Sequence, residues 1–580
     1  MRMPAPFPLS RLRRVVAVVA TTFIAIASHA ASVPPVGAEN GMVVTAQRLA
    51  SKVGVDVLKK GGNAVDAAVA VGYALAVVYP AAGNLGGGGF MTIQLADGRK
   101  TFIDFREKAP LAATPDMYLD KDGNVVKGAS TGGHLAVGVP GSVAGMEHAL
   151  ATYGTLKRGE VIAPAIALAE RGFVLEQGDI DLLATATEGF RKDPATAAIF
   201  LNKGEPYKVG DRLVQKDLAG TLKQIARRGA AGFYQGPVAN AIASSSKAGG
   251  GILTTEDLDK YRVRELAPIE CDYRGYHVVS APPPSSGGVV ICEILNVLEG
   301  YPLRDLGFRS AQSVHYQIEA MRHAYMDRNS YLGDPAFVKN PLDRLLDKNY
   351  AAAIRQAIDP QKAGDSAALK PGVPPHEGSN TTHYSIIDKD GNAVSVTYTL
   401  NDWFGAKVTA AGTGVLLNDE MDDFTIKVGV PNLYGLVQGQ ANSIAPGKTP
   451  LSSMSPTIVT QNGKPVMVVG TPGGSRIITA VLHTILNVID YDMDIQEAVD
   501  APRFHQQWLP EATNIERFAI SPDTRMILEG MGHKLGAPQP ANHVVAILVG
   551  APSLKGKPVG RNRYYGANDP RRNSGLAAGY

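Results

Sequence analysis

The stretch from residue 381 to residue 405, TTHYSIIDKDGNAVSVTYTLNDWFG, places the tightest limits on how this chain can fold. The preceding ten residues, PGVPPHEGSN, are rich in Pro, Gly, Ser and Asn, which predicts an exposed loop. From Thr381 two alternating runs flank a Lys-Asp-Gly-Asn turn, which predicts a β-hairpin. The alternating positions are His383, Ser385 and Ile387 in the first run and Val394, Val396, Tyr398 and Leu400 in the second. Thr381 is therefore predicted to stand where a loop meets a buried hairpin.

A hydroxyl residue at such a junction is a place where a chain can cut itself. Cleavage between Asn380 and Thr381 would give Thr381 a free α-amine beside its own hydroxyl. Such an amine has a pKa near ~7.7, so much of it accepts protons at neutral pH. A threonine paired with its own N-terminal amine is a recognised activated nucleophile. We therefore expect self-cleavage at Asn380–Thr381; the alternative is an ordinary hairpin with threonines on its faces.

The same stretch resembles the signature of the γ-glutamyltranspeptidases, which belong to the N-terminal-nucleophile hydrolase superfamily. The matching positions are Thr381, Thr382, His383, Ser385, Gly391, Asn392, Val394, Thr397, Thr399, Leu400, Asn401, Phe404 and Gly405. Further matches are GGNAVDAAVA at residues 61–70, the glycine loop at 86–90, Arg106-Glu107, APRFH at 501–505 and DPR at 569–571. The resemblance therefore spans nearly all of the chain beyond its first thirty residues.

The resemblance implies an α+β fold, a four-layer αββα sandwich of the N-terminal-nucleophile hydrolase type. It also implies two subunits from one self-cleaved precursor, a large one of residues 31–380 and a small one of residues 381–580. Composition alone supports only an α/β or α+β protein. We expect the two fragments to stay together as a heterodimer, because their interface would be a former core.

Length and charge restrict the class of protein further. At 580 residues, with 45% hydrophobic and 19% charged residues, the chain has the composition of an ordinary soluble globular protein. Its 57 basic and 54 acidic residues give a net charge of only +3, and no basic run is present, so nucleic acid is not an expected partner.

Residues 1–30 have the pattern of a signal peptide. Arg11, Arg13 and Arg14 precede an apolar run at residues 15–27, and Ser28-His29-Ala30 offers a small-x-small cleavage site. We expect an exported, soluble protein, periplasmic in a Gram-negative bacterium or otherwise secreted. Retention as an uncleaved anchor and twin-arginine export are the less favoured alternatives.

The sequence gives little support to a metal or cofactor. The twelve histidines form no HExxH motif, and no cysteine pair has zinc spacing, so no metal or other cofactor is expected. Cys271 and Cys292 are the only cysteines. A disulfide between them is possible, but two free thiols are favoured because the sequence cannot test their separation.

The region before Thr381 is predicted to be mainly helical. Helices are expected at residues 46–60 and 65–78, and a glycine loop at 84–90 leads into strands at 91–95 and 101–104. This loop leaves a helix and enters a strand, the reverse of a phosphate-binding loop, so a tight turn with close backbone packing is favoured over phosphate binding. Residues 133–350 are predicted to form a helix-rich lobe, with helices at 142–153, 161–171, 221–228, 311–326 and from Gly287. Beyond Thr381, strands are expected at 457–460 and 466–469, followed by a helix at 477–489.

Three further positions are candidates for the catalytic machinery beside Thr381. Thr399 lies on the second strand of the hairpin, so its hydroxyl could reach and orient Thr381, as the resemblance implies. Gly473 and Gly474 lie on a turn between a strand and a helix, where backbone amides can stabilise a developing oxyanion. The resemblance places the oxyanion hole at these two glycines.

A γ-glutamyl group carries a carboxylate and an ammonium, so its pocket needs donors and acceptors placed apart. Arg106 can grip the carboxylate in a bidentate manner, with Ser452 and Ser453 as added donors. Asn401, Glu420 and Asp423 can receive the ammonium. All six positions match the substrate contacts of the family. Residues 428–439, VGVPNLYGLVQG, resemble the lid over the pocket, with Tyr434 as its gate.

These features predict a self-processing γ-glutamyltransferase and glutathione hydrolase. Thr381 would attack the γ-amide of glutathione or a related γ-glutamyl compound and pass the acyl group to water or to an amino-acid or dipeptide acceptor. A glutaryl or cephalosporin acylase of the same fold is the first alternative, although the lid and Asp423 favour an amino-acid substrate. A non-catalytic γ-glutamyl-binding protein that stays uncut is the second.

Overall fold

The computed structural model describes residues 32–369, 381–540 and 542–580. The predicted signal peptide and Asn380 therefore lie outside the described residues. All of the described helices and strands belong to one unit, Pro35–Tyr580, and none of these helices is long and apolar enough to cross a membrane.

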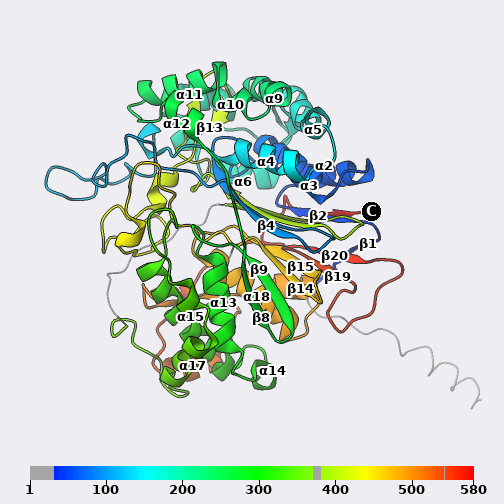
Figure 1. The fold of residues 1–580 in the computed structure, drawn as a ribbon, viewed down its shortest axis with the longest axis vertical. Helices are drawn as coiled ribbons and strands as arrows, with labels where there is room; N and C mark the ends of the chain where they lie inside the picture. Colours follow the sequence, from blue (N-terminus) through cyan, green and yellow to red (C-terminus); the bar gives the residue numbers. More distant parts are fainter. Residues whose placement is uncertain (1–31, 370–380, 541) are drawn as a thin grey trace, which may run out of the picture. The chain divides into compact units, whose positions relative to one another are not determined.

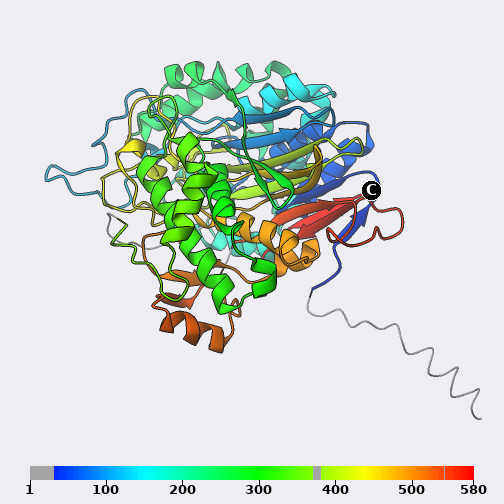
Figure 2. The ribbon, with the colours of Figure 1, turned by 60° about the horizontal axis from the view of Figure 1, so that its bottom comes forward.

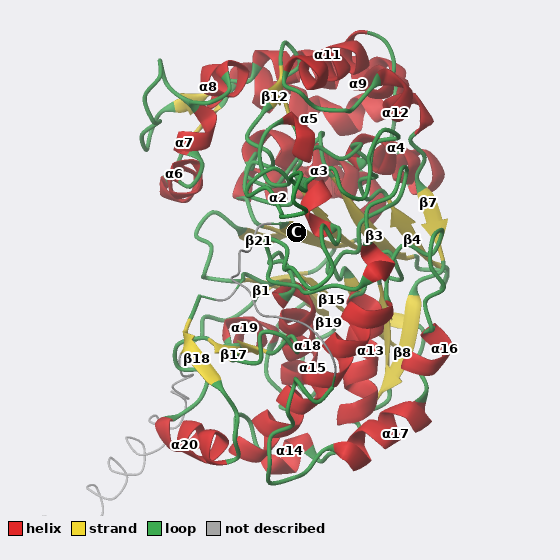
Figure 3. Cartoon of the chain, turned by 90° about the vertical axis from the view of Figure 1, so that its left-hand side faces the viewer, coloured by secondary structure: helices red, strands yellow, loops and turns green. Residues whose placement is uncertain are grey.

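Two seven-stranded sheets dominate the described part of the chain. The first sheet consists, in spatial order, of β21 (Leu576–Gly579), β2 (Met42–Thr45), β10 (Thr382–Ile387), β11 (Ala393–Thr399), β3 (Gly88–Gln94), β4 (Lys100–Asp104) and β7 (Arg264–Leu266). The second consists of β1 (Val36–Ala38), β20 (Tyr564–Asn568), β19 (Val545–Val549), β15 (Lys464–Gly470), β14 (Thr457–Gln461), β9 (Tyr276–Ser280) and β8 (Ile269–Tyr273). The sheets pack face to face around a small apolar core that includes Val44, Ile387, Ile458 and Val545. Figure 3 shows these strands between two groups of helices.

One group of helices covers the outer face of the first sheet (Figure 1). Its central member, α3 (Ala64–Val78), is buried along its whole length because almost every position is Ala or Val. Around it lie α2 (Arg48–Lys59), α4 (Ser142–Tyr153), α5 (Arg158–Arg171) and α9 (Lys216–Arg228). The remaining helices of this region are α6 (Gln177–Ala184), α7 (Thr187–Phe190), α8 (Pro194–Phe200), α10 (Ala231–Tyr234), α11 (Pro237–Ala248) and α12 (Thr255–Lys260).

The second group covers the outer face of the second sheet. It is built on α13 (Gly287–Leu298), α15 (Ala311–Tyr331) and α18 (Arg476–Ile489), whose apolar side chains pack on β14, β15 and β19. The other members are α14 (Leu303–Leu306), α16 (Leu342–Leu345), α17 (Lys348–Ala357), α19 (Ile495–Asp500) and α20 (Pro522–Gly530). The order helices, sheet, sheet, helices confirms the predicted αββα sandwich.

The smaller elements lie in the connections between these layers. They are the strand pairs β5 (Phe173–Val174) with β6 (Arg212–Leu213) and β12 (Thr409–Ala410) with β13 (Val415–Leu416), the three strands β16 (Phe504–His505), β17 (Thr513–Ile515) and β18 (Leu535–Pro538), and the 3-10 turns η1 (His134–Ala136), η2 (Glu420–Asp423) and η3 (Gln440–Asn442).

The hairpin predicted from Thr381 onward is present as β10 and β11, with Thr382 opposite Tyr398 and Ile387 opposite Ala393. Both of its faces are buried. Tyr384, Ile386, Val394, Val396 and Tyr398 face the helices. The intervening polar residues face the second sheet, where Ser385 and Ser395 donate to backbone carbonyls of β19 and β15. The alternating residues therefore face two different buried layers: one face of the hairpin packs on the helices and the other on the second sheet. Neither face is exposed to solvent.

Two predictions about the region before Thr381 are wrong. Residues 264–280 lie inside the predicted helix-rich lobe but form β7, β8 and β9, which complete one edge of each sheet. Cys271 and Cys292 are not free thiols, because they form a disulfide that links β8 to α13. The sequence could not show this, because only the packing of α13 against β8 brings the two cysteines together.

Candidate active site

Thr381 is the first residue before β10 and is almost fully buried, with 3% of its surface exposed. Its Oγ1 lies 3.3 Å from the Oγ1 of Thr399, the last residue of β11. The prediction that Thr399 reaches Thr381 across the hairpin is confirmed. Pairing of adjacent strands brings the two hydroxyls together, although eighteen residues separate them along the chain.

The position of Thr399 is set by its surroundings. Its Oγ1 accepts a hydrogen bond from the backbone amide of Asn401 at 2.8 Å, and its carbonyl accepts one from Nδ2 of Asn84 at 2.8 Å. A Cβ on Gly87 would lie 2.0 Å from that carbonyl oxygen, so only glycine permits this approach. The glycine loop at residues 84–90 is thus the tight, closely packed turn that was favoured over a phosphate-binding loop, and its role is to support Thr399.

A small cavity opens beside the two threonines. Its lining includes every residue predicted for catalysis or substrate binding except Gly473, together with Arg328, which was not predicted. The predicted members are Arg106, Thr381, Thr399, Asn401, Glu420, Asp423, Tyr434, Ser452, Ser453 and Gly474. They come from the ends of strands of both sheets and from loops that are far apart in the sequence.

The turn that carries Gly473 and Gly474 lies between β15 and α18. Both glycines have positive φ, +130° and +56°. A Cβ on Gly474 would lie 2.3 Å from the ring of Tyr434, so the turn packs directly beneath the predicted gate. Within the described residues, neither of the two amides donates a hydrogen bond to the protein. They are therefore available to stabilise negative charge on a bound molecule.

Arg106 makes contacts that the sequence did not suggest. Its two terminal nitrogens pair with Glu420 and Asp423, and Glu107 lies 3.7 Å away. Burial opposes the charged form of Arg106, but the neighbouring carboxylates Glu420 and Asp423 raise its pKa. The predicted carboxylate-binding and ammonium-binding groups thus form one buried ion-paired cluster, because a buried charge requires a partner.

This cluster retains unused acceptors. Glu420 Oε2 and Asn401 Oδ1 are buried and have no hydrogen-bond partner among the described residues. Burial raises the pKa of Glu420 well above its ordinary value, with a partial opposing effect from Arg106. Buried acceptors are normally satisfied, so these atoms are suited to donors from a bound molecule, such as an ammonium group.

Arg328 is the functional candidate that the sequence analysis missed. It lies on α15, is 1% exposed, and donates to Ser453 Oγ at 3.1 Å and Ser286 Oγ at 2.9 Å. Burial lowers its pKa to about 10, so it stays charged at neutral pH. No carboxylate of the described residues forms an ion pair with it. A buried cation of this kind at the wall of the cavity is suited to a carboxylate ligand. An arginine within a long helix gives no signal of this in the sequence.

Tyr434 closes the cavity from the predicted lid. Its hydroxyl donates to the carbonyl of Asn401 at 2.7 Å, and only 4% of the residue is exposed. Asn432 holds the lid by accepting from the Tyr434 amide at 3.0 Å and by donating to Asp423 at 3.3 Å. The predicted gate therefore contacts both the catalytic strand and the predicted ammonium site.

No histidine of the described residues lines this cavity. His383 is the nearest along the strand, but its ring is hydrogen-bonded to Thr397 at 2.7 Å and Ser385 at 3.1 Å. Burial lowers the pKa of His383 to about 3. The α-amine of a released Thr381 remains the group best placed to accept the hydroxyl proton.

Known proteins match this chain in sequence and in fold. The model of the family described as gamma-glutamyltranspeptidase matches residues 50–579. The chain belongs to the gamma-glutamyltranspeptidase family. It is an enzyme, and its sandwich is that of the N-terminal-nucleophile hydrolases.

Two relatives and one solved structure illustrate the similarity. A glutathione hydrolase proenzyme from Pseudomonas sp. (strain A14) is 76% identical over 553 residues, 95% of this chain and 96% of the relative. That of Escherichia coli (strain K12) is 51% identical, over 94% of this chain and 93% of the relative. The crystal structure of cephalosporin acylase from Bacillus halodurans has a TM-score of 0.81 and 28% identity, covering 95% of this chain and 98% of that one.

Proposed function

We propose that this chain is a self-processing γ-glutamyltransferase that hydrolyses glutathione and related γ-glutamyl compounds. One observation carries the proposal: Thr381 and Thr399 meet at a single cavity. The same cavity is lined by Gly474, whose backbone amide is available, and by the ion-paired side chains of Arg106, Glu420 and Asp423. The name of the relative with 76% identity supports glutathione as donor.

The first step is cleavage of the chain itself, between Asn380 and Thr381. The Thr381 oxygen attacks the Asn380 carbonyl carbon, the C–N bond breaks, and the nitrogen takes the hydroxyl proton to become an amine. Water then opens the resulting ester and restores the hydroxyl. The products are a large fragment that ends at Asn380 and a small fragment that begins at Thr381.

Transfer follows the same chemistry. The Thr381 amine takes the hydroxyl proton while the oxygen attacks the γ-carbonyl of the donor, and the amides of Gly473 and Gly474 stabilise the oxyanion. Collapse breaks the γ-amide bond, and the leaving nitrogen takes the proton. A γ-glutamyl ester on Thr381 remains, and water, an amino acid or a dipeptide attacks it to release the product.

The pocket orients the γ-glutamyl group through charge. Asn401, Glu420 and Asp423 receive the α-ammonium, while Arg106, Arg328 and the hydroxyls of Ser452 and Ser453 receive the α-carboxylate. When the donor binds, its α-carboxylate competes with Glu420 and Asp423 for Arg106. Its α-ammonium then balances the negative charge of these two carboxylates. Net charge in the pocket is thereby conserved, which limits the cost of burying the substrate's charges.

The proposal includes export to an oxidising compartment. The signal-peptide pattern of residues 1–30 and the disulfide between Cys271 and Cys292 support it, because structural disulfides persist outside the reducing cytosol. Detection of the processed protein in the periplasmic or extracellular fraction, lacking its first thirty residues, is the corresponding test.

A γ-glutamyl donor assay tests the central activity. We expect rapid release of p-nitroaniline from γ-glutamyl-p-nitroanilide and slow deacylation of glutaryl-cephalosporanate. The acylase is the second candidate because the solved cephalosporin acylase has the same fold and an acylase ACY 1 proenzyme from Pseudomonas sp. (strain V22) is 41% identical. The two glutathione hydrolase proenzymes at 76% and 51% identity favour the hydrolase. Preference for the glutaryl substrate would reverse the assignment.

A further inference from the structure

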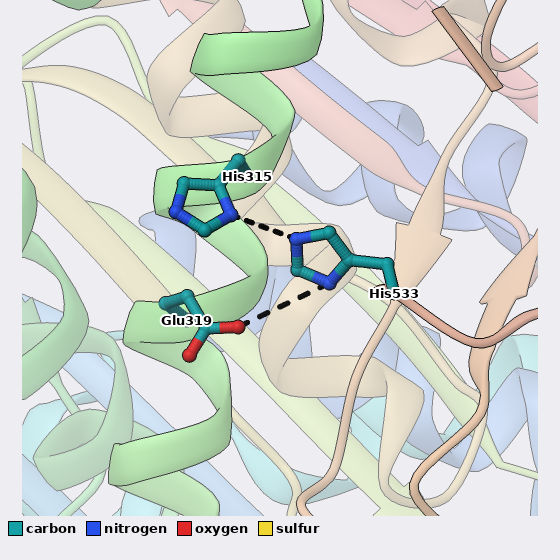
Figure 4. A group of neighbouring side chains, drawn as sticks. All are labelled: His315, Glu319 and His533. Atoms are coloured by element: carbon teal, nitrogen blue, oxygen red, sulfur yellow. Dashed lines mark hydrogen bonds and ion pairs between the residues drawn. The ribbon is translucent and has the colours of Figure 1, made fainter. Parts of the chain in front are cut away.

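Figure 4 shows a buried cluster of two histidines and one glutamate, His315, Glu319 and His533. His315 and Glu319 are one turn apart on α15, so their side chains share a face of the helix. His533 comes from the segment between α20 and β18. The side chains of His533 and Glu319 are 0% and 3% exposed, and His315 is fully buried. None of the three lines the cavity beside Thr381.

The hydrogen bonds around the cluster locate its protons. His315 Nε2 lies 2.8 Å from the carbonyl oxygen of Asp359, which can only accept, so Nε2 carries a proton and Nδ1 a lone pair. That Nδ1 lies 2.7 Å from His533 Nε2, which must therefore be the donor. In a neutral His533 ring the other nitrogen, Nδ1, then also carries a lone pair.

This leaves two electron-rich atoms facing each other in a buried space. His533 Nδ1 lies 3.9 Å from Glu319 Oε1, too far for a hydrogen bond, and has no hydrogen-bond partner among the described residues. A buried lone pair without a donor is costly, and a carboxylate opposite it adds repulsion. Of the described residues, Arg322 contacts Glu319 Oε1 at 3.4 Å, but none donates to His533 Nδ1.

We propose that His315, Glu319 and His533 bind a divalent transition-metal ion of the zinc class. Two imidazole nitrogens and one carboxylate oxygen are a common zinc ligand set, with solvent as the fourth ligand. The candidate ligand atoms all lie within 4.8 Å of one another. The ligand atoms of a tetrahedral zinc ion are separated by about 3.3 Å. Rotation of the histidine side chains would break the hydrogen bond between the two rings and bring one nitrogen of each ring, with the Glu319 oxygen, to this spacing.

The surroundings already resemble the outer contacts of a metal site. The hydrogen bond from His315 to the Asp359 carbonyl is of the kind that fixes the tautomer of a metal-ligating histidine. Glu319 also contacts Arg322 at 3.4 Å, but Arg322 has a second carboxylate, Glu511, at 3.8 Å. Arg322 therefore keeps a partner when a metal ion takes Glu319.

The ion would join two distant parts of the sequence. His315 and Glu319 precede Thr381, whereas His533 follows it. If the chain is cut before Thr381, a point that rests on the proposed function, the ion would bridge the large and small fragments. We expect the ion to affect the stability of the protein and not the catalytic step. Arg328, the cavity residue on the same helix, lies thirteen residues from His315, about 20 Å away along α15.

Metal titration of the processed, untagged protein tests the proposal. After removal of metal with a chelator, the protein is titrated with Zn²⁺ and, as a spectroscopic probe, with Co²⁺. We expect one tightly bound ion per chain and a higher midpoint of thermal unfolding in its presence. Mg²⁺ and Ca²⁺ should not compete, because they prefer all-oxygen sites.

Variants distinguish the cluster from adventitious binding. His315→Gln, His533→Gln and the isosteric Glu319→Gln should each weaken zinc binding at least tenfold. His148→Gln is the matched control, because His148 also contacts a glutamate, Glu265, but is 37% exposed and far from the cluster in sequence. It should bind zinc as the wild type does.

Two results would overturn the proposal. One is a wild-type protein that takes up no zinc at micromolar concentration and gains no thermal stability from it, a readout that needs no variant to fold. The other is equal zinc uptake by the wild type and the three cluster variants. The uncut Thr381→Ala chain keeps all three ligands and should bind zinc equally well, so a failure of self-cleavage and a failure of metal binding give different results.

Discussion

At the scale of single residues, the proposed mechanism depends on how Thr399 holds Thr381. Asn401, Asn84 and the close approach of Gly87 fix Thr399 from three sides, and its hydroxyl reaches Thr381 at 3.3 Å. This arrangement keeps the Thr381 side chain in one orientation before substrate arrives, which removes an entropic cost from the reaction.

Thr399→Ala should therefore impair catalysis, and the loss of the acceptor for the buried Asn401 amide should lower stability by about 1–3 kcal/mol. We expect kcat/KM for γ-glutamyl-p-nitroanilide to fall by about 100-fold, the lower end of the range for the loss of a positioned proton-transfer group. Thr399→Ser should keep most of the activity because it retains the hydroxyl. Steady-state kinetics with thermal unfolding as control would check this, and an equally active Thr399→Ala enzyme would contradict the role of Thr399.

Glu107, which lies beside Arg106, should make the free energy of unfolding depend on pH. Burial raises its pKa from the ordinary 4.5 to about 7, with a smaller opposing effect from Arg106. Between pH 4.5 and about 7, the carboxyl group of Glu107 is protonated in the folded protein but ionised in the unfolded chain. The stabilisation is therefore complete below pH 4.5, decreases through this window and is lost as the pH rises past 7.

Glu107→Gln should remove this dependence, because the amide does not titrate. Urea unfolding at pH 5, 6, 7 and 8 would measure the free energy of unfolding of both proteins. We predict that the wild type loses stability relative to Glu107→Gln as the pH rises. A difference that stays constant across the series would show that Glu107 has an ordinary pKa.

The residues that sequence analysis found and missed differ in a simple respect. The hairpin and its preceding loop predict Thr381 as the nucleophile, whereas the roles of Thr399 and of the two glycines are implied by the family resemblance of their motifs. Arg328 and His533 have no such context: Arg328 occupies an ordinary helical position, and His533 is 218 residues from His315. Only tertiary packing identifies them.

At the scale of elements, the turn before α18 joins catalysis to the lid. Gly474 has φ +56°, and its missing side chain leaves room for the ring of Tyr434. Glycine at this position therefore lets the turn and the tyrosine ring pack against each other.

Gly474→Ala should disturb both features. The added methyl group would meet the Tyr434 ring and strain the backbone, at a cost of about 1–3 kcal/mol in stability. Displacement of an oxyanion-binding amide should lower kcat by about 100-fold or more. Gly220→Ala, in α9 with open space around the added atom, is the control and should leave kcat unchanged. Similar kinetics for both variants would exclude Gly474 from the oxyanion hole.

The elements also show where sequence patterns were sufficient. The hairpin β10–β11 and the helices at residues 65–78, 142–153 and 477–489 followed from periodicity, with ends that agree to within a residue. The hairpin β8–β9 was missed, although Arg274-Gly275 at its turn, both with positive φ, is a usable signal. Its strands were overlooked because they lie within a long run of helical segments.

At the scale of the whole described chain, strands from before and after Thr381 alternate in both sheets. In Figure 2 the yellow-green strands of the hairpin lie among the blue strands of the first sheet. β10 and β11 are bounded by β2 and β3, and β2 is itself bounded by β21. In the second sheet, β1 pairs with β20 and β9 with β14. Separation of the two fragments would thus break five strand pairings.

The cleaved protein should therefore behave as one molecule until it unfolds. We expect the large and small fragments to co-elute in gel filtration under native conditions and to separate only in concentrated denaturant. Thermal unfolding should show a single cooperative transition for both. Recovery of a folded small fragment alone in native buffer would contradict the interleaved arrangement.

The most direct test concerns the residue that becomes a chain end. Purified protein should give two bands in denaturing electrophoresis, and Edman sequencing of the smaller should read Thr-Thr-His-Tyr, with no cleavage and no activity in Thr381→Ala. A single uncut band in an active wild-type preparation, or a smaller fragment that begins at any other residue, would contradict the account.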